Sequence, residues 1–280
     1  MFAQPASDSA VPLIQAIGQT LIVAYREDTT KLEAALTQTG LACEVLRQID
    51  RPEYQGYSSS YRCLLNHHRA WLRATQASQP TLIVEADFVP VMNLGQLPLP
   101  FRLNQTDVGL AWLYTCAPQL YSVTPDGFGE GYSTGLVAYI VTPAAAAALC
   151  QLVTEIAETS YTTFDSEIDK FLRRQGLKNY IPFRNYGEHG GIPNPEHRRN
   201  GLSGIHRADV LWGQLAFLPP YATAVQQPRL ALIQGRLQAR TRGLGRLLAG
   251  KFLRPKVAKT SKRPLLLLRF ALLRQLSGVL

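Results

Sequence analysis

Apolar runs of strand length alternate with amphipathic stretches along the first part of the chain. The run at 19–25 (QTLIVAY) predicts a buried strand, and the run at 41–49 (LACEVLRQI) predicts a second one. The stretch between them, at 28–40, has the apolar spacing of a helix that ends at Gly40. A strand, a helix and a strand in this order indicate the start of a parallel sheet that is covered by helices.

The same alternation continues to about residue 185. It predicts further strands at 80–88, 107–115 and 136–142, and further helices at 58–78, 143–159 and 164–176. The segments at 124–135 and 184–209 are rich in glycine, and the second is also rich in proline and histidine. Both are predicted to be loops of the kind that often borders a functional site.

The charges divide the chain into two unequal parts. All 20 Asp and Glu and 16 of the 29 Lys and Arg lie in the first 228 residues, whereas the other thirteen basic residues follow from Arg229 onward. We therefore predict an α/β body at 15–225, with a mixed, Rossmann-like sheet flanked by helices. A basic, leucine-rich, amphipathic helical tail is predicted at 226–280.

The tail places most of its leucines near one helical face and most of its arginines elsewhere. Helices of this kind lie in a membrane interface, so we expect peripheral binding to an anionic membrane surface at the cytoplasmic face of the plasma membrane. Docking of the tail on the body or on another protein is the second interpretation. Binding to nucleic acid is disfavoured, because the tail has almost none of the aromatic residues on which bases stack.

Composition limits the class of protein. A hydrophobic content of 46% with 18% charged residues is typical of a globular chain and excludes a disordered one. The N-terminal residues lack the pattern of a secretory signal, and no apolar stretch reaches the length of a membrane-spanning helix. The four cysteines are scattered without metal-ligand spacing, which predicts reduced thiols in a cytosolic protein.

The chemistry that the sequence suggests begins at the end of one predicted strand. In TLIVEADF, Glu85 and Asp87 follow an uninterrupted apolar run, where the strand leaves the sheet. Side chains at i and i+2 of an extended chain point the same way, and ligands bind outside the carboxyl ends of parallel strands. A carboxylate pair there suits Mg²⁺ or Mn²⁺. The alternative is that both acids are solvated residues or helix caps at a strand end.

The neighbouring motifs resemble those of glycosyltransferase family 25, which includes lipopolysaccharide and lipooligosaccharide galactosyltransferases and collagen galactosyltransferases. YRCLLNHHRAW resembles the signature Cys-x-x-Ser-His-x-x-x-Trp through Cys63 and His67, with Asn66 in place of the serine. LIVEADFVP resembles the Leu-Glu-Asp-Asp-Ala segment through Glu85 and Asp87, with an alanine in place of the middle acid.

Two later motifs follow in the family's order. GLVAYIVTPAAAAAL resembles Gly-x-x-Ala-Tyr-x-x-x-x-x-Ala through Gly135, Ala138 and Tyr139. EIDKFL resembles Val-Asp-x-Phe-Leu and places Asp169 on the family aspartate, although Asp165 could take that position instead. The four motifs lie within residues 18 to 185.

The resemblance implies a GT-A-like fold and an inverting, metal-dependent transfer of a hexose, with galactose as the expected sugar. The donor would be a UDP-hexose, and the acceptor a lipopolysaccharide or related surface glycan. The alternative is a non-enzymatic, membrane-associated relative that binds a nucleotide or sugar and has lost activity with the middle acid, which Ala86 replaces.

Individual residues have expected roles within that function. Glu85 and Asp87 would bind Mn²⁺ or Mg²⁺, and His189 could complete the set of metal ligands; Asp169 or Asp165, four apart on one helical face, would accept the proton of the attacking hydroxyl. Residues expected to contact the donor, besides the two metal-binding acids, are His67, Tyr139, Glu188 and Arg198. Packing for His67 and surface charge for Arg198 are the competing interpretations.

Overall fold

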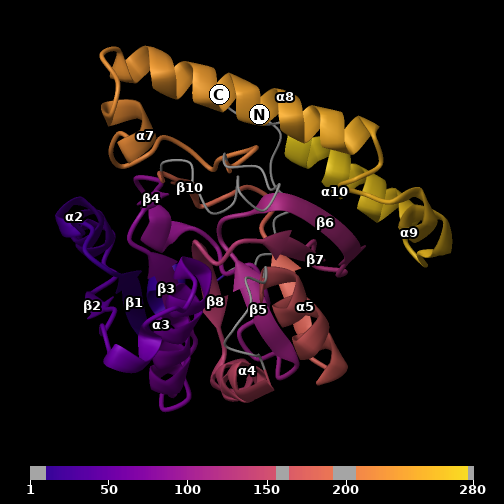
Figure 1. The fold of residues 1–280 in the computed structure, drawn as a ribbon. Helices are drawn as coiled ribbons and strands as arrows, with labels where there is room; N and C mark the ends of the chain where they lie inside the picture. The colour runs from indigo at the N-terminus through magenta and orange to yellow at the C-terminus, as the bar shows by residue number, and fades with distance from the viewer. Residues whose placement is uncertain (1–10, 156–163, 192–205, 277–280) are drawn as a thin grey trace.

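The computed structural model describes residues 11–155, 164–191 and 206–276, without the side chains of 164–166. The described strands form an eight-stranded mixed sheet and a separate two-stranded sheet (Figure 1). The strands are β1 (Gln19–Ala24), β2 (Cys43–Arg47), β3 (Thr81–Glu85), β4 (Phe88–Pro90), β5 (Val108–Trp112), β6 (Cys116–Val123), β7 (Gly129–Thr134), β8 (Ala138–Val141), β9 (Lys178–Ile181) and β10 (Gly187–His189).

Helices cover the sheet and extend beyond one of its ends. They are α1 (Leu13–Ala16), α2 (Thr30–Gln38), α3 (Ser59–Ala74), α4 (Pro143–Glu155), α5 (Phe164–Arg174), α7 (Pro220–Thr223), α8 (Pro228–Leu248), α9 (Pro255–Thr260) and α10 (Pro264–Leu276), with short 3₁₀ turns η1 (Pro52–Tyr54) and η2 (Leu94–Gln96). The prediction of a mixed sheet flanked by helices is confirmed.

The large sheet has the strand order β2-β1-β3-β8-β5-β9-β7-β6. Its first three strands are mutually parallel, as the strand–helix–strand pattern predicts, with α2 and α3 as the connections between them. β8 lies antiparallel between β3 and β5, so β3 and β5 run in the same direction. The carboxyl ends of β1, β2 and β3 therefore lie together at one edge, where a ligand can bind.

Both faces of the sheet are buried, which explains the uninterrupted apolar runs. On β3, Ile83 packs into a core with α3, α4 and α5, whereas Leu82 and Val84 pack into a second core with α1 and α2. Side chains alternate between the faces of a strand, so a strand covered on both faces needs apolar residues at successive positions.

The glycine-rich segment at 124–135 contains the turn and the second strand of a hairpin, so the prediction of a loop there is wrong in part. β6 and β7 pair on either side of a short turn, and glycines lie inside β7. A Cβ atom at Gly131 would overlap the Gln119 carbonyl oxygen, and one at Gly129 would lie 2.8 Å from the Phe270 ring. These glycines allow close packing between strands and helices, which the sequence cannot distinguish from turn formation.

The C-terminal helices are packed against the body. Phe252, Leu267 and Phe270 are buried in the same core as α3, α4 and α5, and Leu120 N donates a 2.8 Å hydrogen bond to Phe252 O. This arrangement matches the second interpretation of the tail, in which it docks on the body. The hydrophobic core therefore extends past residue 226, where the charge of the chain changes. Among the described residues, no helix has the length and hydropathy needed to cross a bilayer.

The face of α8 toward the body contains an arginine and small residues, and three large apolar residues face outward. Arg236, Ala239 and Gly243 are buried, whereas Leu230, Ile233 and Leu237 are exposed by 47%, 55% and 45%. The inward arginine is explained by a buried carboxylate of the body, which needs a cation. An outward apolar stripe remains on this helix.

Candidate functional site

A turn after β3 and the pairing of β4 with β10 bring Glu85, Asp87 and His189 together. β3 ends at Glu85, the chain turns through Ala86 and Asp87, and β4 begins at Phe88. His189 lies opposite Phe88 in the antiparallel β4–β10 pair. Potential ligand atoms of Glu85, Asp87 and His189 all lie within 4.8 Å of one another. The structure thus brings together the three residues expected to bind a metal.

An ion pair connects two of these residues. His189 Nε2 lies 3.0 Å from Asp87 Oδ2, and both side chains are largely buried. Burial disfavours the charged form of each group, but the pairing outweighs it: the pKa of Asp87 is lowered and the pKa of His189 is raised. A Cβ atom at position 191 would overlap Asp87 Oδ2, so Gly191 leaves the space that the pair needs.

Some buried polar atoms in and around this pair do not form hydrogen bonds with the described residues. Asp87 Oδ1, His189 Nδ1 and the Tyr114 hydroxyl have no hydrogen-bond partner in the part of the chain that the structure describes. Buried polar atoms usually have a partner, which can be water or an ion. Two carboxylates and an imidazole are a ligand set for a divalent cation, and the imidazole favours Mn²⁺ over Mg²⁺. The residues present therefore fit the expected metal.

Glu85 is held by a buried hydrogen-bonded chain. His67 Nε2 lies 3.1 Å from Glu85 Oε1, His67 Nδ1 lies 2.9 Å from the Tyr139 hydroxyl, and Trp71 Nε1 donates to that hydroxyl at 2.8 Å. An ionised carboxylate only accepts, so in a neutral His67 the proton is on Nε2 and Nδ1 accepts from Tyr139. His67 and Tyr139 are almost fully buried, so they orient Glu85 and do not contact a donor, contrary to our expectation.

A cavity of about 300 Å³ opens beside Glu85 and Asp87, at the carboxyl ends of β1, β2 and β3. The first turns of α3 form its opposite wall, and Arg62 is the cation of that wall. Its volume is at the lower end of the range for sites of small organic ligands. The lining residues are Val23, Ala24, Tyr25, Glu27, Gln48, Ser59, Arg62, Cys63, Asn66, Glu85, Ala86 and Asp87.

Arg207 is a site residue that the sequence did not indicate. Its guanidinium donates to His189 O at 3.1 Å and to His206 O at 2.6 Å, and lies 3.7 Å from the centre of the Tyr221 ring. Arg207 thus fixes the backbone beside His189 and adds positive charge near Asp87. The arginine predicted from the sequence to contact the donor was Arg198, whereas Arg207 belongs to no motif.

Glu188 is part of the attachment of α8, and its assignment to donor binding is corrected. Its side chain is fully buried, and Oε2 accepts from Arg236 Nη1 at 2.6 Å while Oε1 accepts from Ala208 N at 2.7 Å and from His189 N at 3.0 Å. Burial raises the pKa of Glu188, against the opposing effect of Arg236. Glu188 therefore positions His189 through the hydrogen bond that it accepts from the backbone N–H of that residue.

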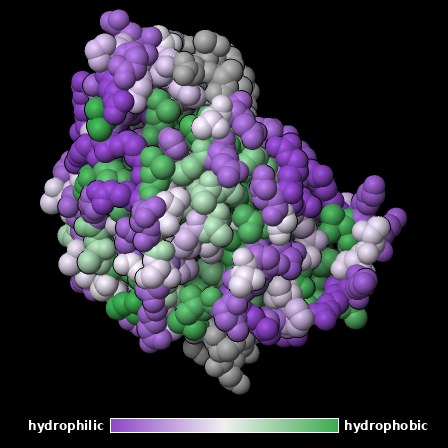
Figure 2. All heavy atoms as spheres, turned by 90° about the horizontal axis from the view of Figure 1, so that it is seen from below, coloured by the Kyte–Doolittle hydropathy of each residue, from purple (hydrophilic) through white to green (hydrophobic). Residues whose placement is uncertain are grey.

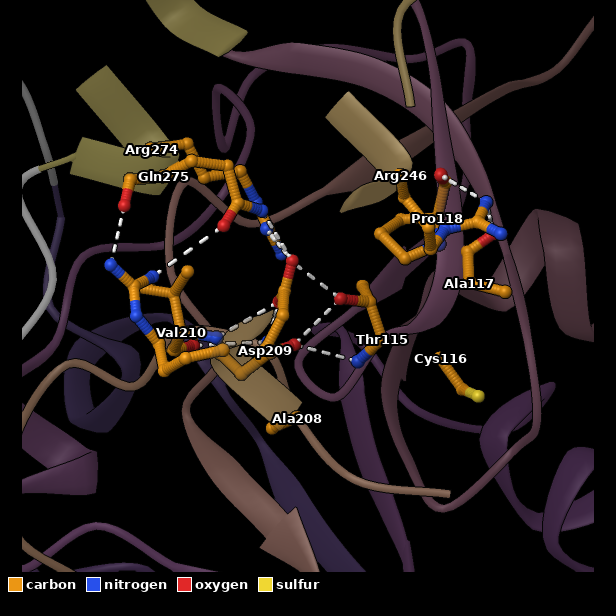
Figure 3. Close-up of polar contacts among 12 residues, drawn as sticks. Thr115, Cys116, Ala117, Pro118, Ala208, Asp209, Val210, Arg246, Arg274 and Gln275 are labelled. Atoms are coloured by element: carbon orange, nitrogen blue, oxygen red, sulfur yellow. Dashed lines mark hydrogen bonds and ion pairs between the residues drawn. The ribbon is translucent and has the colours of Figure 1, made fainter. Parts of the chain in front are cut away.

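A second buried acid attaches α10 (Figure 3). Asp209 forms an ion pair with Arg274 and accepts from Gln275 Nε2 at 2.6 Å and, through Oδ1, from Asn185 Nδ2 at 3.0 Å. Arg274 also donates to Thr115 Oγ1 at 3.2 Å. Burial opposes the ionisation of Asp209, but Arg274 outweighs it and the pKa of Asp209 is lowered. Two buried carboxylates thus account for inward-facing arginines of the basic tail.

Asp169 lies away from the acidic cluster. Asn179 Nδ2 donates to Asp169 Oδ1 at 2.9 Å and the Tyr121 hydroxyl donates to Oδ2 at 3.2 Å. β9 runs parallel to β5, and β5 runs in the same direction as β3. Asn179 is at the start of β9, so it lies at the amino ends of these strands. The cluster lies at the opposite edge of the sheet, at the carboxyl end of β3. Asp169 is therefore a buried structural acid, and the proposal that it accepts a proton at the cluster is corrected. The Asp165 side chain and Arg198 lie outside the described part of the chain.

Comparisons with known proteins find a structural similarity but no match in sequence. No family model and no curated protein sequence matches the chain. Among solved structures, the chain is similar to a glycosyltransferase involved in the glycosylation of the major capsid of PBCV-1, with a TM-score of 0.39 and 11% sequence identity over 59% of this chain and 82% of that chain. At this level of similarity, function is inferred from the residues of the chain itself.

Proposed function

We propose that the protein is a metal-dependent glycosyltransferase that moves a hexose from a nucleotide-sugar to a glycan acceptor. The observation that carries the proposal is the convergence of Glu85, Asp87 and His189 at the mouth of a cavity formed by the ends of three parallel strands. This is the position at which α/β sheets bind nucleotides. The motifs shared with glycosyltransferase family 25 support the same activity, with a UDP-hexose as donor and a lipopolysaccharide-like glycan as acceptor.

The chain's own residues bind and orient the donor. The cavity takes the nucleoside, with the wall of β1 and β2 on one side and the start of α3 on the other. Arg62 lines the cavity, so its guanidinium group can bind an anionic oxygen of the donor. His67 holds Glu85, and Glu188 with Arg207 holds His189, so the ligand atoms are preorganised.

The metal-binding residues face the part of the donor where charge develops. Glu85, Asp87 and His189 would hold Mn²⁺, or Mg²⁺ less well, and the bound ion would neutralise the negative charge of the departing diphosphate. The alanine between the two acids removes a third carboxylate from this edge. Asp165 stays the candidate for the group that accepts the acceptor's proton.

A thermal-shift panel of nucleotide-sugars, each with and without Mn²⁺, tests the function. We expect a UDP-hexose with Mn²⁺ to raise the melting temperature more than either component alone, because binding to the folded state stabilises it by mass action. Turnover of the donor that stabilises the protein is then measured by release of the nucleoside diphosphate. Stabilisation without turnover would favour the non-enzymatic relative, and no stabilisation by any donor would contradict the proposal.

We also propose that the protein binds an anionic membrane surface through α8, where a lipid-linked acceptor is found. The support is the outward stripe of Leu230, Ile233 and Leu237, with exposed arginines at 229 and 242 on the same helix. Apolar residues that face outward beside cations are typical of helices that lie in a membrane interface. The face seen from below in Figure 2, at the other end of the molecule from α8 in Figure 1, shows hydrophilic and hydrophobic residues intermingled.

Cosedimentation with anionic phospholipid vesicles measures this binding. Changing Leu230, Ile233 and Leu237 together to Ser is expected to weaken it at least about tenfold, because each apolar side chain contributes about 1.5–3 kcal/mol when fully buried and 1.4 kcal/mol is a factor of ten. Leu72→Ser, at an exposed position of α3, is the matched control and leaves binding unchanged. Wild-type protein that stays in the supernatant at low salt would contradict membrane binding.

A further inference from the structure

A second group of potential metal ligands shares Glu85 with the first. The sulfur of Cys63, Nε2 of His67 and a carboxylate oxygen of Glu85 all lie within 4.8 Å of one another. Cys63 and His67 are four residues apart on α3, so both side chains lie on the same face of this helix. The spacing of the cysteines could not indicate this group, because its other ligands are a histidine and a carboxylate from a separate strand.

The distances in this group are close to those around a tetrahedral zinc ion. His67 Nε2 lies 3.1 Å from Glu85 Oε1, and Cys63 Sγ lies 3.8 Å from the same oxygen. Zinc bonds of about 2.3 Å to sulfur and about 2.1 Å to nitrogen and oxygen place a nitrogen–oxygen pair about 3.4 Å apart and a sulfur–oxygen pair about 3.6 Å apart. Shifts of a few tenths of an ångström would therefore bring these ligands to bonding positions.

The support behind His67 is of the kind found at metal sites. A histidine ligand usually donates its other ring N–H to a nearby acceptor. When Nε2 binds the ion, the proton of neutral His67 lies on Nδ1, which then donates to the Tyr139 hydroxyl 2.9 Å away. Trp71 Nε1 in turn donates to that hydroxyl at 2.8 Å. His67 is 1% exposed, so its ring is held in place with Nε2 toward Glu85 and Cys63.

We propose that Cys63, His67 and Glu85 form a second cation site, which is selective for Zn²⁺ or a comparably soft divalent ion. Thiolate and imidazole ligands favour such ions, whereas the first group, with two carboxylates, favours Mn²⁺ or Mg²⁺. Cys63 and Glu85 line the cavity, so the ion can enter from solvent and keep a water molecule as its fourth ligand. Because Glu85 belongs to both groups, Zn²⁺ at the second site competes with Mn²⁺ at the first.

Titration of the reduced, full-length protein with Co²⁺ tests this site without any nucleotide-sugar. A cobalt–thiolate bond gives a charge-transfer absorption band in the near ultraviolet, which we expect to saturate at one equivalent and to be displaced by Zn²⁺. Cys63→Ser is expected to remove the band. Cys150→Ser, at a half-buried position of α4, is the matched control and keeps it. Asp87→Asn also keeps the band, because Asp87 belongs only to the first group.

A second measurement needs no variant. Zn²⁺ is expected to slow the alkylation of Cys63 in the wild-type protein at least tenfold, as followed by mass spectrometry, and to leave the alkylation of Cys150 unchanged. The site is refuted if the wild type shows no band, if the band persists in Cys63→Ser, or if Zn²⁺ fails to protect Cys63. A protein that binds no nucleotide-sugar would refute the proposed function and leave these results unaffected.

Discussion

Replacing Asp87 with Asn is expected to remove the stabilisation by Mn²⁺ and UDP-hexose and to lower the transfer rate at least about 100-fold. Asn keeps the size of the side chain but has no negative charge to bind the ion. A metal ion acting as a Lewis acid stabilises the transition state by several kcal/mol, and about 1.4 kcal/mol corresponds to a tenfold change in rate. The melting temperature with and without Mn²⁺, and the release of nucleoside diphosphate, measure the two effects.

Asp126→Asn is the matched control for this change. Asp126 forms a peripheral ion pair with Arg102 at 2.5 Å and is not one of the cluster residues, so its loss is expected to leave the response to Mn²⁺ unchanged. A full Mn²⁺-dependent shift in Asp87→Asn would show that the ion binds elsewhere.

Replacing Arg274 with Ala is expected to lower the free energy of unfolding by about 3–5 kcal/mol, because it leaves the Asp209 carboxylate buried without its cation. Arg274 has no exposed surface. The substitution also removes the hydrogen bond to Thr115 and the guanidinium group that lies 5.2 Å from the centre of the Phe252 ring. Denaturation in urea, followed by circular dichroism, measures the change.

Two further variants separate the buried charge from general damage to α10. Arg269→Ala, at an exposed position of this helix, is expected to change the free energy of unfolding by less than about 0.5 kcal/mol. Asp209→Asn added to Arg274→Ala recovers part of the loss, because it removes the unpaired charge. A loss below about 1 kcal/mol in Arg274→Ala would contradict the structural role of the pair.

Hydrophobic periodicity was sufficient to predict the first half of the fold. The strands around β1, β2 and β3 and the helices α2 and α3 were found from local patterns, because each is connected to the next and β1 and β3 are buried on both faces. The hairpin of β6 and β7 was missed, since the glycines of β7 serve close contacts with Gln119 of the partner strand and with Phe270, which is distant in sequence.

The orientation of the C-terminal helices could not be predicted for a related reason. The sequence shows that leucines and arginines lie on different faces of α8, but it does not show which face meets the body. That choice depends on Glu188, a buried carboxylate that is far from α8 in sequence and becomes its neighbour only in the fold.

Part of the candidate site was predicted from the sequence. Glu85, Asp87 and His189 were named together, but the reason given was incomplete: the chain does not remain extended through Asp87, and the acids converge because it turns after Glu85. Arg207 and Tyr114 have no motif, and only the assembled fold places them beside His189. Asp169 was assigned by motif alone, and the motif carries no information about the end of the sheet at which it lies.

The most direct test of the metal site is anomalous X-ray scattering from crystals grown with Mn²⁺ and UDP. We expect one strong manganese peak within bonding distance of Glu85, Asp87 and His189, with the diphosphate on its open side and the uridine in the cavity beside β1 and β2. A nucleotide bound in that cavity with no manganese at the three side chains, or manganese bound only elsewhere, would contradict the proposed site.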